Sequence, residues 1–448
     1  MNNYDTICAI STALGKSAIN IIRLSGEDSI EIASKIISGV DIRKKEGGTI
    51  THAYVKDGEN YIDEILVSVF RAPKSYTGEN LVEINTHGGA YVTEKVFDML
   101  IALGARVALP GEFTKRAFIN NKMDLTSAEA VMDIVNANTR KSLDLANKAL
   151  HKDIYNLVHE LRENIMDILL QIEVNIDYPE YEDEIEISHE KVKHDTNILI
   201  NKISDLIDKA EVMRVYKEGI KTVILGKPNV GKSSLLNALL NQNKAIVTNI
   251  SGTTRDIVEG EINIGGIVLH LLDTAGVRNT DNPIERIGIK KTLEVLEEAE
   301  LVLLVLDTSS PLDKEDYSLL EMTKDKKRII IGNKIDLNGR LDIVDIVNVS
   351  SITKAGVDEL KKKIIQLFIA EDMDKETEVS ISSTRHISLL KEALASLKEA
   401  YESEKEGLYL DMLEIDFKKA YTSLGLITGE EATSDIVDEL FKKFCLGK

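Results

Sequence analysis

The sequence predicts a multidomain fold: an N-terminal α+β domain, a discontinuous α-helical domain, and an α/β domain inserted into the helical one. Three observations support this organisation. The chain has 448 residues, which is too long for a single ordinary core, since domains usually have ~100–200 residues. Its hydrophobic pattern changes near residues 120, 216 and 372. The helical segments before and after the α/β pattern resemble halves of one bundle.

The first 120 residues predict the α+β domain. Short β-branched runs, A-I-N-I-I-R-L and E-I-L-V-S-V-F, alternate with turn signals such as Asp57-Gly58 and Pro110-Gly111. This segment carries 13 Lys and Arg against 15 Asp and Glu, although the whole chain has a net charge of -20. Broad, non-specific adhesion to nucleic acid is therefore disfavoured, and a site for an anion is least opposed in this domain and in local loops elsewhere.

Residues 121–215 predict the first part of the helical domain. Between Glu112 and Tyr178 the chain has neither Gly nor Pro, and apolar residues recur every three or four positions, so we expect long helices. The acidic run E-Y-E-D-E-I-E, residues 180–186, predicts a solvated loop. Residues 372–448 predict the second part, whose last helix carries Val437, Leu440, Phe441 and Phe444 on one face. Insertion between two such parts is favoured when the ends of the inserted domain lie close together.

Residues 216–371 predict the α/β domain. The apolar runs K-T-V-I-L-G, I-V-L-H-L-L-D, L-V-L-L-V-L-D and R-I-I-I-G-N are separated by helical segments, which is typical of a parallel sheet covered on both faces. Directly after the first run, G-K-P-N-V-G-K-S at Gly226–Ser233 fits the phosphate-loop pattern. Backbone N–H groups of such a loop wrap phosphates, Lys232 can reach the β and γ phosphates, and the Ser233 hydroxyl suits Mg²⁺.

Three further motifs point to a guanine nucleotide. D-T-A-G at 273–276 and N-K-I-D at 333–336 each end a predicted strand. An Asp can act there on the Mg²⁺ shell or accept the two N–H donors of a guanine edge, which adenine cannot supply. T-N-I-S-G-T-T-R-D at 248–256 lies where a switch loop belongs, with Thr254 as a second Mg²⁺ ligand. The four motifs in this order indicate a GTPase.

The attacking water needs a partner that the D-T-A-G turn does not provide. Ras-type enzymes place a Gln after this turn, but here the next residue is Val277, which cannot hydrogen-bond. Glu285 could hold the water and Arg278 could touch phosphate. From spacing alone, the interpretation of each as a solvated switch residue is the favoured one.

Over nearly its full length the chain resembles the MnmE (TrmE) family of tRNA-modifying GTPases. The resemblance lies in Y-T-G-E-N, H-G-G, P-G-E-F-T-K-R-A-F-I-N-N-K-M-D-L, S-G-T-T-R-D, E-R-I-G and the terminal C-L-G-K, with the nucleotide motifs. It implies an N-terminal folate-binding and dimerising domain, a discontinuous helical domain and an inserted G domain. It also implies a homodimer that works on tRNA with an FAD-containing, MnmG-type flavoprotein. Together these would add an aminomethyl or carboxymethylaminomethyl group to C5 of the wobble uridine, position 34, with a one-carbon unit from 5-formyl or 5,10-methylene tetrahydrofolate.

The resemblance also assigns roles to residues of this chain. It implies that Glu285 positions the catalytic water. It implies a K⁺ ion, which can neutralise charge as an arginine finger does, held by Asn229, Thr248, Ile250 and Thr253. Mg²⁺ would be held by Ser233 and Thr254. Folate would be bound by Arg23, Glu79, Lys122 and Lys448. The full set expected around GTP is Asn229, Val230, Gly231, Lys232, Ser233, Ser234, Thr248, Asn249, Ile250, Ser251, Gly252, Thr253, Thr254, Asp273, Thr274, Ala275, Gly276, Asn333, Lys334, Asp336, Ser350, Ser351 and Ile352.

Cys445, one of two cysteines with Cys8, has three interpretations. It stands at the right distance from the end for prenylation, but Gly447 and Lys448 fit that motif poorly. It could extend the apolar side of the last helix. It could also be a catalytic thiol, because the resemblance places this tail at the folate site. Packing and catalysis both stay open.

Two other functions share part of these sequence features. A ribosome-assembly GTPase would share the G-domain motifs, and a stand-alone folate-dependent one-carbon transferase would need no flavoprotein. The sequence has no apolar run of about 18 residues and no basic, then apolar, leader at its start. Two distant cysteines argue against a disulfide framework. We therefore expect a cytoplasmic protein with no membrane attachment.

Overall fold

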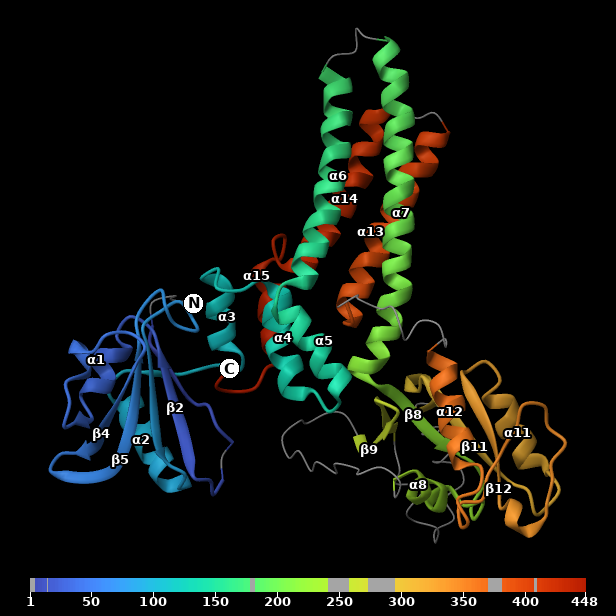
Figure 1. The fold of residues 1–448 in the computed structure, drawn as a ribbon, viewed down its shortest axis with the longest axis horizontal. Helices are drawn as coiled ribbons and strands as arrows, with labels where there is room; N and C mark the ends of the chain where they lie inside the picture. The colour runs from blue at the N-terminus through green and yellow to red at the C-terminus, as the bar shows by residue number, and fades with distance from the viewer. Residues whose placement is uncertain are drawn as a thin grey trace. The chain divides into compact units, whose positions relative to one another are not determined.

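A computed structural model of the chain describes residues 5–13, 15–177, 182–240, 258–272, 295–369, 381–406 and 409–448 (Figure 1). The chain divides into two compact units. Unit 1 consists of Met1–Val135, Ala149–Leu170 and Phe417–Lys448, and unit 2 consists of Asn136–Lys148 and Gln171–Asp416. Each unit therefore combines segments from distant parts of the sequence.

The N-terminal part of unit 1 is a seven-stranded sheet in the order β3-β4-β5-β6-β2-β1-β7. The strands are β1 Ile7–Ile10, β2 Ile19–Ser25, β3 Ile37–Ser38, β4 Thr49–Asp57, β5 Asn60–Phe70, β6 Leu81–His87 and β7 Arg106–Val107. All neighbours pair antiparallel except β1 and β7. The helices α1 Ser29–Ser34 and α2 Ala90–Ala102 bury Ile30, Val96 and Leu100 in one core with the sheet. The predicted α+β fold is confirmed.

The rest of unit 1 is helical. Its elements include α3 Glu112–Ile119, α4 Leu125–Asn136, α15 Ser434–Phe441 and, from Phe417 onward, α14 Leu410–Thr428. The predicted apolar face of the last helix is buried, since Val437, Phe441 and Phe444 pack against Leu125 and Met132 of α4. Segments from the two ends of the helical sequence therefore share one core.

Unit 2 contains a six-stranded sheet in the order β13-β12-β11-β8-β10-β9. The strands are β8 Ile220–Leu225, β9 Val258–Ile264, β10 Ile267–Leu272, β11 Leu301–Asp307, β12 Arg328–Asn333 and β13 Val347–Asn348. The four predicted strands are parallel to one another, while β9 pairs antiparallel with β10. Two apolar cores contain residues of this sheet. One includes residues of α8 Lys232–Leu240 and α12 Val357–Phe368, and the other packs against residues of α11 Lys314–Met322 (Figure 1). Both faces of the sheet are covered, as predicted.

The helices that flank this sheet in sequence pack together. In unit 2, α7 Glu182–Glu218 lies beside α13 Thr384–Lys405. The expectation of long helices holds for α7 and for α6 Asp153–Asp177, while the segment before them is broken into α3, α4 and α5 Arg140–Leu150.

The solvated loop predicted for the acidic run is wrong from residue 182 onward, because α7 begins there. Acidic residues are favourable in the first turn of a helix, where they offset the positive end of its dipole. Residues 180 and 181 lie outside the described residues. Among the residues that the structure does describe, no helix is long and apolar enough to cross a bilayer.

Candidate functional sites

The phosphate loop joins β8 to α8 in unit 2. Gly226 and Gly231 have φ of 149° and 97°, and Asn229 has φ of 63°, so the loop needs backbone conformations that favour glycine at two positions. A Cβ atom on Gly226 would lie 2.3 Å from the carbonyl oxygen of Val305 on β11. The glycine at this position therefore lets the loop pass close over the neighbouring strand.

The ammonium of Lys232 lies inside this loop. It donates hydrogen bonds of 2.7 Å to the carbonyl oxygens of Gly226 and Lys227. Burial lowers the pKa of Lys232. A phosphate arriving in the loop would offer this ammonium charged acceptors in place of two neutral carbonyls, and hydrogen bonds to charged groups are the stronger kind.

The N-K-I-D segment ends β12 beside the phosphate loop. Asn333 is buried; its amide nitrogen donates to the carbonyl of Val230 at 2.8 Å, and its amide oxygen accepts from the N–H of Ser351 at 3.1 Å. A Cβ atom on Gly231 would lie 2.2 Å from that amide nitrogen. One side chain therefore joins three of the predicted GTP-binding segments.

The predicted base-binding residues are themselves held by partners. Asp336 accepts a hydrogen bond of 2.6 Å from the Ser350 hydroxyl, which leaves its second carboxylate oxygen available for a ligand. Lys334 forms an ion pair of 2.6 Å with Asp307 at the end of β11. The side chain of Ile352, in the Ser350–Ile352 loop, is 78% exposed.

Part of the predicted nucleotide site cannot be placed. The switch segment Thr248–Thr254, the D-T-A-G segment Asp273–Gly276 with Val277 and Arg278, and Glu285 all lie outside the described residues. The described residues therefore bring together the phosphate loop, Ser233 and Ser234 at the start of α8, and the base-binding loops. The Mg²⁺, K⁺ and water-positioning roles stay predictions.

A second site, which we name the tail site, forms where the C-terminal tail meets the N-terminal sheet within unit 1. Arg23 on β2 pairs with Glu83 on β6 at 2.8 Å and donates to the carbonyl of Gly447 at 3.3 Å. Its guanidinium also lies 5.5 Å from the ring centroid of Tyr76. Arg23 is thus a contact point for the tail rather than a free surface charge.

The tail is held by its backbone, while its thiol stays exposed. The N–H of Gly111 donates to the carbonyl of Cys445 at 3.3 Å, and the Ser11 hydroxyl donates to that of Gly447 at 3.1 Å. Cys445 is exposed, and α15 ends four residues before it, so the thiol neither extends the helix nor fills the core. Burial lowers the pKa of the Lys448 ammonium, with Arg23 adding repulsion and Cys445 acting in the opposite direction.

Of the other predicted folate residues, Glu79 lies on the loop between β5 and β6, and Lys122, in the turn after α3, contacts that loop. Lys122 donates to the carbonyl of Pro73 at 3.0 Å and is exposed. Glu79 is bound more tightly: its carboxylate accepts from the Ser25 hydroxyl at 2.6 Å and from Arg116 at 3.1 and 3.2 Å. The β5–β6 loop is therefore anchored through Pro73 to the turn after α3 and through Glu79 to α3 itself.

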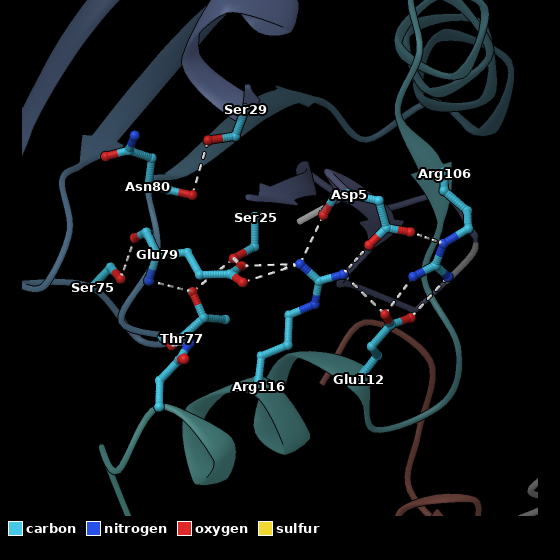
Figure 2. A network of polar contacts seen from close by, with 11 residues as sticks. Asp5, Ser25, Ser29, Ser75, Thr77, Glu79, Asn80, Arg106, Glu112 and Arg116 are labelled. Carbon is cyan, nitrogen blue, oxygen red and sulfur yellow. Dashed lines mark hydrogen bonds and ion pairs between the residues drawn. The ribbon is translucent and has the colours of Figure 1, made fainter. Parts of the chain in front are cut away.

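Sequence reasoning missed the buried ion network behind Glu79. Figure 2 shows Arg116, from α3, between Glu79 on one side and Asp5 and Glu112 on the other. Arg116 donates to the Asp5 carboxylate at 2.6 Å and to Glu112 at 3.1 Å, and Arg106 bridges the same two acids with bonds of 2.5 Å. The only available signal was the spacing of Glu112 and Arg116 by four residues within P-G-E-F-T-K-R.

This network holds the pKa of two of its acids, Asp5 and Glu112, below the ordinary values. The hydrogen bond from Arg106 lowers the pKa of Asp5. Burial opposes the ionisation of Glu112, but hydrogen bonds from Arg106, Leu109 N–H and Arg116 still hold its pKa below the ordinary value. Two cations and three carboxylates thus join the start of β1, the β5–β6 loop and α3.

Two protein-family models match this chain. Residues 6–122 match the model described as the GTP-binding protein TrmE N-terminus, and residues 125–445 match the MnmE helical domain. The G domain of FeoB from Methanococcus jannaschii matches 34% of this chain and 98% of its own length at 28% identity, with a TM-score of 0.25. A score at that level supports no conclusion about this chain.

Sequence relatives match from end to end. A protein of Aster yellows witches'-broom phytoplasma (strain AYWB) named tRNA modification GTPase MnmE is 45% identical, covering 99% of this chain and 100% of the relative. Proteins of the same name from Lactococcus lactis subsp. cremoris (strain MG1363) and Streptococcus gordonii (strain Challis) are each 44% identical, covering 99% of both chains. These matches and the family models show that the chain belongs to the MnmE family of tRNA modification GTPases.

Proposed function

We propose that this chain binds and hydrolyses GTP and, with an MnmG-type flavoprotein, adds an aminomethyl or carboxymethylaminomethyl group to C5 of the wobble uridine of certain tRNAs. The observation that carries the proposal is the contact of Asn333 with both the phosphate loop and Ser351, in a chain whose full length matches the family. We further propose that the protein acts as a cytoplasmic homodimer.

The nucleotide site would work through charge and orientation. Lys232 would leave its two carbonyl partners for the β and γ phosphates, and Asp336 would accept the N–H donors of guanine with the oxygen that Ser350 does not occupy. Mg²⁺ fits a hydroxyl at the first turn of α8, so Ser233 would be one ligand and Thr254 another; the ion would neutralise phosphate charge. Glu285 would orient the attacking water.

A potassium ion would complete the charge neutralisation. The donor set proposed from Asn229, Thr248, Ile250 and Thr253 is rich in oxygen, as a hard cation requires. Asn229 lies in the phosphate loop in a left-handed conformation, which the shape of that loop imposes. Hydrolysis should be faster in K⁺ than in Na⁺ at equal ionic strength. Equal rates in the two salts would contradict the potassium site.

The tail site fits a folate by its chemistry. Arg23 and Lys448 would meet the carboxylates of the glutamate tail, while Lys122 and Glu79 would contact the remainder of the ligand. The folate, 5-formyl or 5,10-methylene tetrahydrofolate, would supply the one-carbon unit. Exposure of Cys445 beside these groups favours its proposed role as a catalytic thiol over a packing role.

Mass spectrometry of tRNA nucleosides tests the proposal. Cells that lack the gene should lose the modified wobble uridine, and wild type should restore it. Cys445→Ser should fail to restore it while keeping GTP hydrolysis and the fold. Restoration by the serine variant would leave Cys445 without a role in the reaction, and an unchanged nucleoside in the deletion strain would refute the modification function itself.

A further inference from the structure

A basic surface of exposed and half-buried cations borders the tail site in unit 1. Its cations lie on the loop before β4, on the loop after β5 and in the turn after α3. We name it the basic platform, and its residues are Arg43, Lys44, Lys45, Arg71, Lys74 and Lys122. In a chain with a net charge of -20, such a concentration of cations is a local feature that the overall composition opposes.

Backbone contacts hold the loops of the basic platform together. The Arg71 guanidinium donates to the carbonyl of Lys45 at 3.0 Å and to that of Arg43 at 2.6 Å. Lys122 donates to the carbonyl of Pro73, which precedes Lys74. Arg71 therefore orders the loop, and its bonds to backbone carbonyls neutralise no charge.

Acidic neighbours balance only part of the basic platform. Arg43 pairs with Asp41 at 2.9 Å and with Glu31 at 3.8 Å, and Asp41 also lies 3.7 Å from Lys44, whose side chain is 84% exposed. Within the described part of the chain, no carboxylate lies within 4.0 Å of the ammonium groups of Lys45 and Lys74. These two lysines can therefore meet an external anion without first breaking an ion pair.

The loop between β5 and β6 links the basic platform to the site that holds the C-terminal thiol. The loop that carries Lys74 continues to Tyr76, whose ring lies beside Arg23. Arg23 contacts Gly447, two residues after Cys445. An anionic polymer on the basic platform would therefore run past the thiol.

We propose that the basic platform binds the phosphate backbone of the tRNA and so presents the substrate to the tail site. This inference rests on the proposed function. Phosphate contacts position a nucleic acid without reading its sequence, and lysine serves well as an exposed point charge for them. Lysine is depleted in protein–protein interfaces, so these residues favour RNA over an acidic protein partner.

The test compares two triple variants of the full-length chain. The platform variant carries Lys44→Gln, Lys45→Gln and Lys74→Gln. The control variant removes the same charge from exposed lysines elsewhere, with Lys148→Gln, Lys314→Gln and Lys398→Gln. Fluorescence anisotropy with an unmodified, labelled tRNA transcript measures Kd across a salt series, and nucleoside mass spectrometry of complemented deletion cells follows modification.

The platform variant should bind tRNA at least tenfold more weakly than wild type and control. Its slope of log affinity against log salt should be shallower by about two to three, since each lost phosphate contact removes roughly 0.7 to 0.9. GTP hydrolysis and melting temperature should match wild type, and modified uridine should fall in the complemented cells.

Other outcomes overturn the inference. A platform variant with wild-type affinity and slope would refute it, as would a wild-type chain that does not bind tRNA. If the platform variant still binds tRNA but no longer binds the purified flavoprotein, the basic platform is a site for a protein partner. If it still binds tRNA but no longer binds a folyl polyglutamate, the basic platform is a site for the folate tail. If wild type does not restore the nucleoside, the proposed function itself has failed, whereas equal restoration by both variants rejects only the basic platform.

Discussion

Replacing Arg116 by Met should loosen the attachment of α3 to the N-terminal sheet. Arg116 is 8% exposed and contacts Asp5, Glu79 and Glu112. The methionine keeps much of the side-chain volume but removes the charge and all donors. Asp5 and Glu112 would keep Arg106, whereas Glu79 would lose its cation and keep only the hydroxyl of Ser25.

The size of the stability loss depends on which charged groups stay paired after the substitution. Breaking a fully buried ion pair costs roughly 3–5 kcal/mol because a charge is left uncompensated. The Glu79 side chain is 18% exposed and keeps one hydrogen bond, so we expect a lower value, about 2–3 kcal/mol. For a unit of about 190 residues, each kcal/mol of lost stability lowers the melting temperature by roughly 2–4 °C. The expected fall in melting temperature is therefore about 4–12 °C.

Scanning calorimetry of the full-length chain measures this shift. Hydrogen exchange in peptides that cover β2 and β6 identifies the transition of the N-terminal sheet. Arg43→Met removes an exposed, ion-paired arginine of the same sheet domain and should leave the transition in place. A shift below about 2 °C for Arg116→Met would refute the reasoning. Folate affinity should fall as well, because Glu79 would lose its anchor.

Three further predictions concern the nucleotide site and acid stability. Gly231→Ala should weaken GTP binding at least tenfold in a fluorescent-nucleotide titration, because its methyl group would lie 2.2 Å from the amide nitrogen of Asn333; unchanged affinity would contradict this packing. Asp336→Asn should weaken GTP binding about 100-fold by losing charged acceptors for guanine, and xanthosine triphosphate should compete better with the variant than with wild type. The lowered pKa values of Asp5 and Glu112 mean that the folded state binds protons less readily than the unfolded chain. The stability that these two ionised acids give the fold should therefore be complete above their unfolded pKa, about 4, and should decline as the pH falls through their folded pKa. Melting temperatures from circular dichroism at pH 6 and pH 3 measure this decline. Equal melting temperatures would mean that the network contributes nothing to stability.

Local patterns predicted much of the architecture. The four apolar runs of the α/β domain became β8, β10, β11 and β12, because a strand buried on both faces needs continuous apolar residues. The antiparallel edge strand β9, V-E-G-E-I-N-I, has a mixed polar pattern and was not predicted. The acidic run predicts a loop because its charges suggest solvation, but charge does not prevent helix formation at a helix start.

The amino-acid sequence by itself determined the nucleotide motifs and the family, because these depend on residue types at short, fixed spacings. Only the tertiary structure decided which distant groups meet. It joined Asn333 to the phosphate loop, placed the tail against Arg23 and assembled the Arg116 network. Those contacts span up to 424 residues of sequence, so their partners are chosen by the packing of whole elements and not by any local pattern.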